Sequence, residues 1–263
     1  MKPNASPGSP AHPEGVPMIV DAVADIVRRR VPSDRSLRHL DIGAGWGDLI
    51  KRLRKSHPGI QSFGVDYNPS HFDLTDVPIA HADLNVERLP YDDRSFDLVT
   101  CTEVIEHLEN FRWVVREAAR VARPGGLFVG STPNVLSIKS RWAYFTRGFF
   151  TYFDPLPLKD DPGLYPGQRH LTPVPFFYFG HALLDSGFEG VEPHADKSQR
   201  SSAFWAVVLL PLLKLVATGA RRRRIRHSGA RLDSIEEMAE RNNSWPVLTG
   251  RTLIVTARRS AGA

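Results

Sequence analysis

The stretch "LDIGAGWGDL", residues 40–49, decides the fold of this 263-residue chain. It joins an apolar, strand-like run to an amphipathic helical pattern through three glycines, Gly43, Gly45 and Gly47. Because glycine lacks a Cβ, the backbone of such a loop can approach a ligand closely. A glycine pattern alone is weak evidence for a binding site, so its meaning depends on what surrounds it in the chain.

Short apolar runs alternate with amphipathic helical patterns along most of the chain. The expected strands are 37–42, 61–65, 79–81, 96–100, 126–131, a run near 188–193 and the final "RTLIVTARR" at 251–259. The expected helices are 16–30, 47–56, 110–122 and 173–187. This alternation predicts an α/β domain in which helices cover both faces of a parallel sheet.

The composition is that of a globular protein, with 41% hydrophobic and 24% charged residues and a net charge of +5. The length favours one domain, residues 16–263, over two. Residues 1–15 lack the apolar core of a signal peptide and are dense in proline, glycine and serine, so we expect a disordered tail. The single cysteine, Cys101, excludes an internal disulfide framework and fits a reducing, cytoplasmic compartment.

Two segments interrupt the alternation. Residues 135–172 are rich in aromatic residues and proline and are too long for an ordinary connection, so we expect a lid or acceptor-binding insertion. Its aromatic residues at 141–153 suit a sugar face, an isoprenoid tail, a membrane-facing surface or simply the core of a lid. Residues 195–248 hold an apolar run and a basic cluster, and we expect an insertion that meets a membrane surface or a partner.

Acidic residues end the next two expected strands. Asp66 closes "SFGVD" at 62–66, where its carboxylate can accept hydrogen bonds from ribose hydroxyls. Asp83 lies in "HADLN" at 81–85, where the end of a third strand would meet an adenine ring. These positions give the glycine loop the context of a nucleotide site.

With these motifs in order, followed by "FDLV" at 96–99 and "RPGG" at 123–126, the chain resembles the class I S-adenosylmethionine-dependent methyltransferases. The resemblance implies a Rossmann-like, doubly wound, seven-stranded sheet and S-adenosyl-L-methionine as cofactor. It implies cofactor-binding roles for Asp41, Gly43, Gly45, Trp46, Gly47, Asp66, Asp83 and Leu84. Asp41 is expected to orient the glycine loop, and Trp46 either packs over the cofactor or caps a helix. A similar fold that binds another cofactor, such as NAD, is the alternative.

Three potential ligands stand in "CTEVIEHLEN", residues 101–110, directly after the expected fourth strand. Ligands of open α/β sheets bind beyond the carboxyl ends of the strands, so we expect catalytic residues at this edge of the sheet, which we call the rim. If the chain turns helical after Thr102, then Glu103, Glu106 and His107 share one helical face. Two carboxylates and an imidazole suit a divalent ion.

The "EVIEH" run is similar to the ligand motif of small-RNA 2′-O-methyltransferases and of ubiquinone-pathway O-methyltransferases, which implies a bound divalent metal such as Mg²⁺. The downstream "QRHLTP" at 168–173 makes His170 a candidate fourth ligand, although the chain lacks the His-rich stretch of the RNA enzymes. Two other interpretations stay open. The residues form a polar rim without a metal, or the turn is purely structural.

Both the metal and the metal-free interpretation of this rim favour O-methylation. A hydroxyl is a poor nucleophile near neutral pH, and a metal would lower its pKa. Without a metal, His107 or His170 is the candidate general base, because imidazole titrates near the working pH. N-methylation stays open, since an amine needs less activation.

The apolar run "AFWAVVLLPLLKLVA", residues 203–217, is interrupted by Pro211 and Lys214 and is followed by the basic cluster 221–226. As a helix it would reach roughly 22 Å, short of the ~30 Å hydrocarbon core of a bilayer. We therefore expect residues 203–226 to lie on an anionic membrane, at its cytoplasmic face. A buried helix with a solvated basic end and a nucleic-acid patch are the alternatives.

A membrane-surface enzyme suggests a lipid-linked acceptor. "STPN" at 131–134 and "HLTP" at 170–173 are similar to segments of bacterial methyltransferases of cell-surface glycans and lipids, so a lipid-linked or cell-envelope glycan ranks first and a quinone-type phenol second. An RNA 2′-O-methyltransferase would share the metal motif, but the apolar run makes nucleic acid a less favoured partner. A non-enzymatic membrane-binding scaffold is disfavoured by the intact glycine loop. The sequence does not indicate an oligomeric state.

Overall fold

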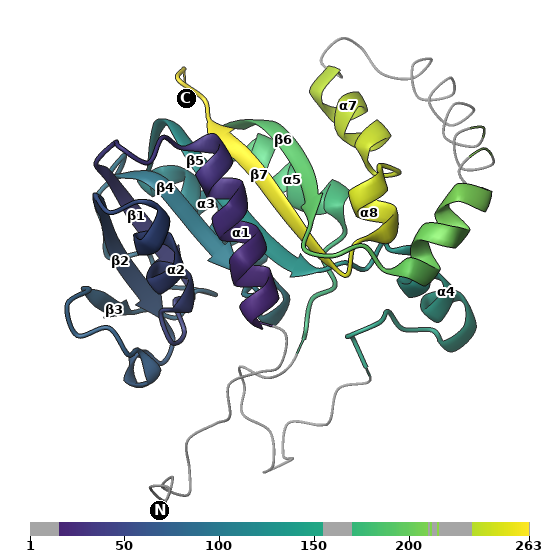
Figure 1. Cartoon of the computed structure of the whole chain (residues 1–263), viewed down its shortest axis with the longest axis horizontal. Helices are drawn as coiled ribbons and strands as arrows, with labels where there is room; N and C mark the ends of the chain where they lie inside the picture. Colours follow the sequence, from purple (N-terminus) through teal and green to yellow (C-terminus); the bar gives the residue numbers. More distant parts are fainter. Residues whose placement is uncertain (1–15, 155–169, 210, 212–214, 216–232, 263) are drawn as a thin grey trace, which may run out of the picture.

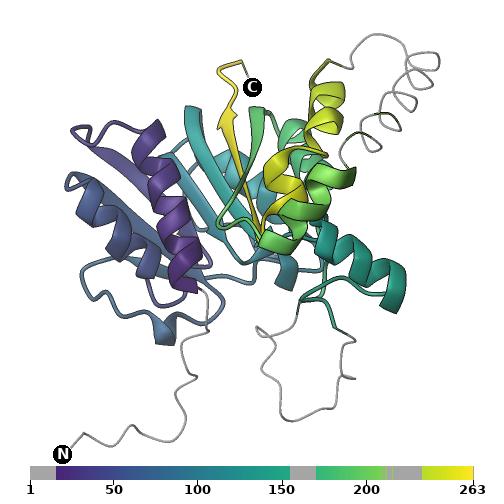
Figure 2. The ribbon, with the colours of Figure 1, turned by 45° about the vertical axis from the view of Figure 1, so that its right-hand side comes forward.

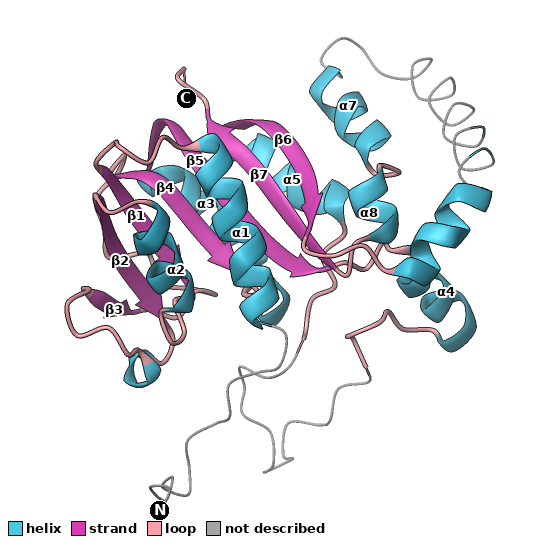
Figure 3. Cartoon of the chain, viewed as in Figure 1, coloured by secondary structure: helices cyan, strands magenta, loops and turns pink. Residues whose placement is uncertain are grey.

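The computed structural model describes residues 16–154, 170–209, 211, 215 and 233–262 of the chain. The expected tail at 1–15 and the basic cluster at 221–226 lie outside these described residues. Within them, one seven-stranded sheet runs through the molecule, with helices on both of its faces (Figure 1 and Figure 3). This architecture confirms the predicted α/β fold class.

The strands follow the order β3-β2-β1-β4-β5-β7-β6. Their bounds are β1 Leu37–Ile42, β2 Ile60–Asp66, β3 Ile79–His81, β4 Phe96–Thr102, β5 Ala122–Pro133, β6 Phe188–Ala195 and β7 Thr252–Arg259. Strand β7 is antiparallel to both of its neighbours, whereas the pairs from β3 to β5 are parallel. The sheet is therefore mixed. The alternation of elements predicted parallel pairing throughout, and β7 departs from that prediction by running antiparallel to both β5 and β6.

The helices divide between the two faces of the sheet. Helices α1 (Val16–Arg30) and α2 (Asp48–Ser56) share one hydrophobic core, and α3 (Phe111–Val121) and α5 (Phe176–Asp185) share the other. Successive strand residues alternate between these cores, with Leu98 in the first and Val99 in the second. The strands are thus buried on both faces, which leaves the carboxyl ends of the sheet as the exposed place for a ligand.

Shorter helices lie within the two insertions, where no element had been predicted in detail. They are α4 (Ile138–Arg147), a helix at residues 200–209, α7 (Asp233–Arg241) and α8 (Trp245–Thr249). The side-chain amide of Asn134 joins the insertions, because its Nδ2 donates to the carbonyls of Val247 and Gly250, each at 2.9 Å. No helix among the described residues is long and apolar enough to cross a membrane.

Candidate active site

The glycine loop lies between β1 and α2 in a conformation that favours glycine. Gly43, Gly45 and Gly47 have φ angles of 73°, 51° and 77°, in the left-handed region that a Cβ disfavours. A Cβ on Gly43 would lie 2.2 Å from Cγ2 of Val104, whereas a Cβ on Gly45 would meet no atom within 4 Å. Gly43 thus packs the loop against the segment after β4, and Gly45 borders open space that a ligand can fill.

Asp66, at the end of β2, holds the glycine loop through its side chain. Its Oδ2 accepts from the Gly45 amide at 2.9 Å, and its Oδ1 accepts from the Asn68 amide at 2.8 Å. The carboxylate is half-buried and lies beside the open space at Gly45. This position is compatible with the ribose-binding role predicted for Asp66, which stays a prediction.

Asp41 lies buried beneath the loop, at the end of a hydrogen-bonded chain that crosses three strands. Its Oδ1 accepts from Thr100 Oγ1 at 2.6 Å, and Thr100 Oγ1 lies 2.8 Å from Nε2 of His39. The other ring nitrogen of His39 lies 3.2 Å from Ser62 Oγ. Burial raises the pKa of Asp41 to about 7 and lowers the pKa of His39 to about 3. The imidazole is therefore neutral, and a polar chain runs through the middle of the sheet to the site.

The remaining residues predicted to bind the methyl donor are Asp83, Leu84 and Trp46. Asp83 Oδ1 accepts from the Asn85 amide at 2.9 Å and so closes a turn directly after β3, while Leu84 is buried. The Trp46 ring stacks on His71 of the 3₁₀ helix η1 (Pro69–His71), with ring centroids 5.3 Å apart. Trp46 thus covers the loop between β2 and β3, and its role toward a cofactor stays a prediction.

The helical turn predicted after Thr102 is wrong. Glu103 has a φ angle of 53°, and only a single 3₁₀ turn, η2 (Ile105–His107), follows it. Ser131 on β5 imposes this bend, because its hydroxyl donates to Glu103 Oε1 at 2.8 Å and accepts from the Glu103 amide at 3.1 Å. Glu103 consequently does not share a face with Glu106 and His107.

The structure instead brings Glu106 and His107 to His170. Ligand atoms of these three residues all lie within 4.8 Å of one another, and the two imidazole centroids are 4.9 Å apart. The backbone creates this arrangement, since the amides of Leu171 and Thr172 donate to the Glu106 carbonyl at 2.7 and 3.0 Å. We call Glu106, His107 and His170 the rim cluster.

The environment of the rim cluster suits a proton or a cation. Both carboxylate oxygens of Glu106 are buried and lack a hydrogen-bond partner among the described residues. Burial, and next the charge of Glu103, raise the pKa of Glu106 well above its usual value. His170 Nδ1 lies 2.7 Å from the Tyr152 carbonyl, so Nδ1 carries the proton and Nε2 the lone pair. Burial lowers the pKa of His170, with the Tyr152 carbonyl acting in the opposite direction.

Glu103 belongs to a second polar group that sequence reasoning missed. Burial raises the pKa of Glu103 to about 7. The charge of Asp196 also raises this pKa, whereas the charge of Arg251 lowers it. Arg251 donates twice to Asp196 Oδ2, at 2.9 and 2.6 Å. Asp196 and Arg251 flank the late insertion, more than fifty residues apart in sequence, and no local pattern marks them as partners.

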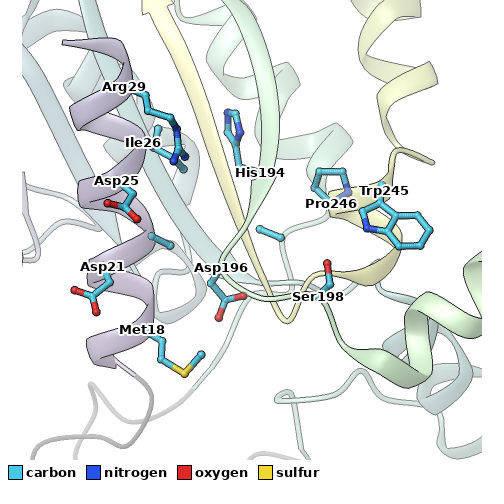
Figure 4. Close-up of a pocket in the computed structure, with 12 residues that line it drawn as sticks. Met18, Asp21, Asp25, Ile26, Arg29, His194, Asp196, Ser198, Trp245 and Pro246 are labelled. Atoms are coloured by element: carbon cyan, nitrogen blue, oxygen red, sulfur yellow. The ribbon is translucent and has the colours of Figure 1, made fainter. Parts of the chain in front are cut away.

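A separate groove of about 600 Å³ opens beside this second group, between α1 and the chain after β6 (Figure 4). Met18, Asp21 and Asp25 on α1 face Asp196 across the groove, and Trp245 lies on its far side (Figure 4). None of the predicted cofactor residues and no member of the rim cluster lines it. The groove is therefore distinct from the glycine-loop site.

Comparison with known proteins agrees with this geometry. Residues 40–130 match the model of the methyltransferase domain family. A demethylmenaquinone methyltransferase of Deinococcus radiodurans is 31% identical over 113 residues, covering 38% of this chain and 47% of that protein. A ubiquinone biosynthesis O-methyltransferase of Methylococcus capsulatus is 30% identical over 142 residues, covering 48% of this chain and 59% of that protein.

Among solved structures, a SAM-dependent methyltransferase from Archaeoglobus fulgidus superposes with a TM-score of 0.55 at 20% identity, covering 91% of this chain and 94% of that one. That likeness supports the fold alone. Residues 40–130 thus match a methyltransferase domain, and the chain as a whole is similar in fold to S-adenosylmethionine-dependent methyltransferases of class I. It spans about half the length of the curated relatives that it matches.

Proposed function

We propose that the protein transfers a methyl group from S-adenosylmethionine to a hydroxyl oxygen of a membrane-associated acceptor, with a lipid-linked or cell-envelope glycan as first candidate. One observation carries the proposal. Glu106 and His107 of the rim cluster follow β4 directly, and Val104 of the same segment packs against Gly43 of the glycine loop. The rim cluster, which could activate the acceptor hydroxyl, thus lies near the glycine loop, which could bind S-adenosylmethionine.

The chain's own residues fit the donor. Gly45 leaves an open space at a left-handed loop, which suits a ligand in close contact with the backbone. Asp66 ends β2 beside this space and Asp83 follows β3, which supports these two carboxylates as acceptors for the hydroxyl and amino groups of a nucleoside. The sulfonium of the donor supplies an already activated methyl group, and the protein mainly has to align the acceptor.

The rim cluster provides a base for the acceptor. Burial keeps His170 neutral at pH 7 by lowering its pKa, and the hydrogen bond from Nδ1 to Tyr152 leaves the lone pair on Nε2. Nε2 of His170 can therefore take the proton of a hydroxyl as that oxygen attacks the methyl carbon. His107, whose ring meets that of His170 edge to face, is the second candidate base.

A divalent cation fits the same residues. One carboxylate and two imidazoles within 4.8 Å of one another can serve as ligands of a divalent cation. The two carboxylate oxygens of Glu106, which lack a hydrogen-bond partner among the described residues, would gain one in the ion. Such an ion would lower the pKa of the acceptor hydroxyl. Glu103, which the sequence placed in this set, instead accepts a hydrogen bond from Ser131.

The relatives favour a second acceptor class, a phenolic quinone precursor. Curated proteins named ubiquinone biosynthesis O-methyltransferase and demethylmenaquinone methyltransferase match this chain at 30–31% identity. The matched stretches cover less than half of this chain, so they support the methyl-transfer chemistry more than the acceptor. Both acceptor classes carry a hydroxyl and a lipid chain.

The test is to incubate the protein with methyl-labelled S-adenosylmethionine and an extract of the source cells, with and without a chelator, and to separate lipid, glycolipid, quinone and RNA fractions. We expect label in a lipid fraction, and loss of that label in His170→Asn with donor affinity unchanged by calorimetry. Label in RNA would contradict the proposed acceptor. Failure to bind the donor in calorimetry would contradict the enzymatic function itself.

A further inference from the structure

The helix at residues 200–209 exposes large apolar side chains to solvent and buries small ones. Its inward positions carry the small residues Ser202 and Ala206, which are 1% and 0% exposed. Phe204, Val207 and Val208 are more than half exposed. Helices of soluble domains normally turn their large apolar residues toward the core. This helix therefore presents a hydrophobic face outward.

The outward face continues along the helical repeat. Phe204, Val207, Val208, Pro211 and Leu215 stand at i, i+3, i+4, i+7 and i+11, and all of them are exposed, Leu215 by 71%. An unbroken stripe at this spacing is the pattern of an amphipathic helix whose apolar side expects a covering surface.

Helix α4 repeats the same inversion. Ser140 and Ala143 face inward, while Trp142 and Phe145 are 66% and 80% exposed and lie in ring contact with each other at 5.8 Å. Arg141 anchors the inner side of this helix by donating to the Leu136 carbonyl at 2.7 Å and to Asn243 Oδ1 at 3.4 Å. The helix is thus fixed to the domain with its large aromatic residues outward.

The two helices lie side by side although their sequences are about sixty residues apart. The Lys139 amide donates to Ser202 Oγ at 3.4 Å, and both views of the ribbon place α4 next to the green helix that follows β6 (Figure 1 and Figure 2). The exposed apolar residues of these two neighbouring helices, which we call the apolar surface, are Trp142, Phe145, Phe204, Val207, Val208 and Leu215.

Exposed basic residues stand on and beside the two helices. Lys139 and Arg147 on α4, Lys197 before the second helix and Arg200 at its start are exposed. The sequence from Lys197 to Leu232 contains no aspartate or glutamate, and it includes five arginines between positions 221 and 226. A partner that covers this surface must accept large apolar side chains and bring negative charge.

We infer that the apolar surface docks onto an anionic phospholipid bilayer, with Trp142 and Phe145 in the interfacial layer and the basic residues at the lipid headgroups. Such a bilayer binds proteins that insert aromatic and aliphatic side chains into the interfacial layer and place basic side chains at the lipid headgroups. This inference deepens the proposed function and rests on it for the nature of the acceptor.

The apolar surface leads directly to the rim cluster. Helix α4 ends at Arg147, and the turn that follows brings the Tyr152 carbonyl to His170 Nδ1 at 2.7 Å and the buried Phe153 ring to within 5.3 Å of the His170 ring. A bilayer that covers α4 therefore lies next to the group that would take the acceptor's proton. A lipid-bearing acceptor could reach the cluster without leaving the membrane.

The experiment is flotation of the full-length protein with vesicles of phosphatidylcholine alone and of phosphatidylcholine mixed with phosphatidylglycerol. We expect binding to the mixed vesicles only, weakened at high salt, and a blue shift of tryptophan fluorescence. The double variants Trp142→Ser/Phe145→Ser and Phe204→Ser/Val208→Ser should each lower the partition constant by about tenfold or more. Tyr178→Ser, which changes an aromatic residue on α5 that is 56% exposed, is the control and should bind as the wild type does.

Three outcomes would overturn the inference. They are no binding to either kind of vesicle, undiminished binding of both double variants, and self-association through this surface, seen as a dimer in sedimentation velocity that the variants lose. Donor affinity, measured by calorimetry on the same samples, reports on the proposed function separately. A variant that still binds the donor but no longer floats shows that only docking has failed, and a wild type that floats without binding the donor refutes only the methyl transfer.

Discussion

The hydroxyl of Thr100 donates to the carboxylate of Asp41 across a distance of 2.6 Å, between Cα partners on neighbouring strands. Because a hydroxyl has a single proton, Thr100 must in turn accept from Nε2–H of His39, which lies 2.8 Å away. Nδ1 of the neutral ring then accepts from Ser62. The chain ends at Asp41, the residue beneath the glycine loop.

Thr100→Val keeps the shape of the side chain but removes the donor to Asp41. We expect the free energy of unfolding to fall by about 1–3 kcal/mol, because two buried polar groups lose a partner. Donor affinity should fall as well, since Asp41 loses its orientation. Denaturant unfolding and calorimetry measure the two effects. Thr256→Val is the matched control, because it removes a buried hydroxyl bonded to His194 at 3.0 Å on β7. The control should lose stability without losing donor affinity.

Asp41 predicts a pH dependence of stability. Burial raises its pKa from 3.8 to about 7, with the Thr100 hydrogen bond acting in the opposite direction. The folded protein then binds more protons than the unfolded chain between these two values, so the contribution of Asp41 to stability falls as pH rises through this window. Asp41→Asn should flatten that slope in unfolding measurements from pH 4 to pH 8. An unchanged slope in the variant would mean that Asp41 titrates normally.

Gly45→Ala tests whether the open space beside the loop belongs to the donor. The substituted Cβ meets no protein atom, so the protein should fold, with a strain of about 1–2 kcal/mol from the positive φ. If the donor fills that space, its affinity in calorimetry should drop by roughly tenfold or more. Gly125→Ala has the same kind of positive φ and open surroundings, far from the loop in sequence, and serves as control. Equal donor affinity in both variants would remove Gly45 from the site.

Glu106→Gln and Glu103→Gln separate the two carboxylates that the sequence had grouped. Only Glu106 lies with His107 and His170, so titration with Co²⁺, followed by its absorption spectrum, should show binding in the wild type and in Glu103→Gln. Glu106→Gln should weaken that binding by about tenfold or more, because a neutral amide replaces a charged ligand. Identical spectra for all three proteins would exclude the cation from the rim cluster, and a loss confined to Glu103→Gln would restore the grouping that the sequence suggested.

Much of the fold could be predicted because its signals are local. The expected bounds of the helix at 16–30 and the strands at 37–42 and 79–81 coincide with those of α1, β1 and β3. Apolar periodicity and glycine punctuation depend only on neighbours along the chain. The short helices of the insertions escaped prediction, and for α8 one reason is that its position is fixed by the distant side chain of Asn134, which donates to the carbonyls of Val247 and Gly250.

The sequence by itself determined the order of strands and helices, the glycine loop and the rim on which the ligand chemistry must lie, because each of these follows from residue spacing. Only the tertiary structure decided which polar residues meet there. Ser131 bends the chain at Glu103, the amides of Leu171 and Thr172 bring His170 to Glu106, and His39 joins Thr100 across the sheet. Such contacts link residues that are distant in the chain, and their geometry depends on packing between strands rather than on any local pattern.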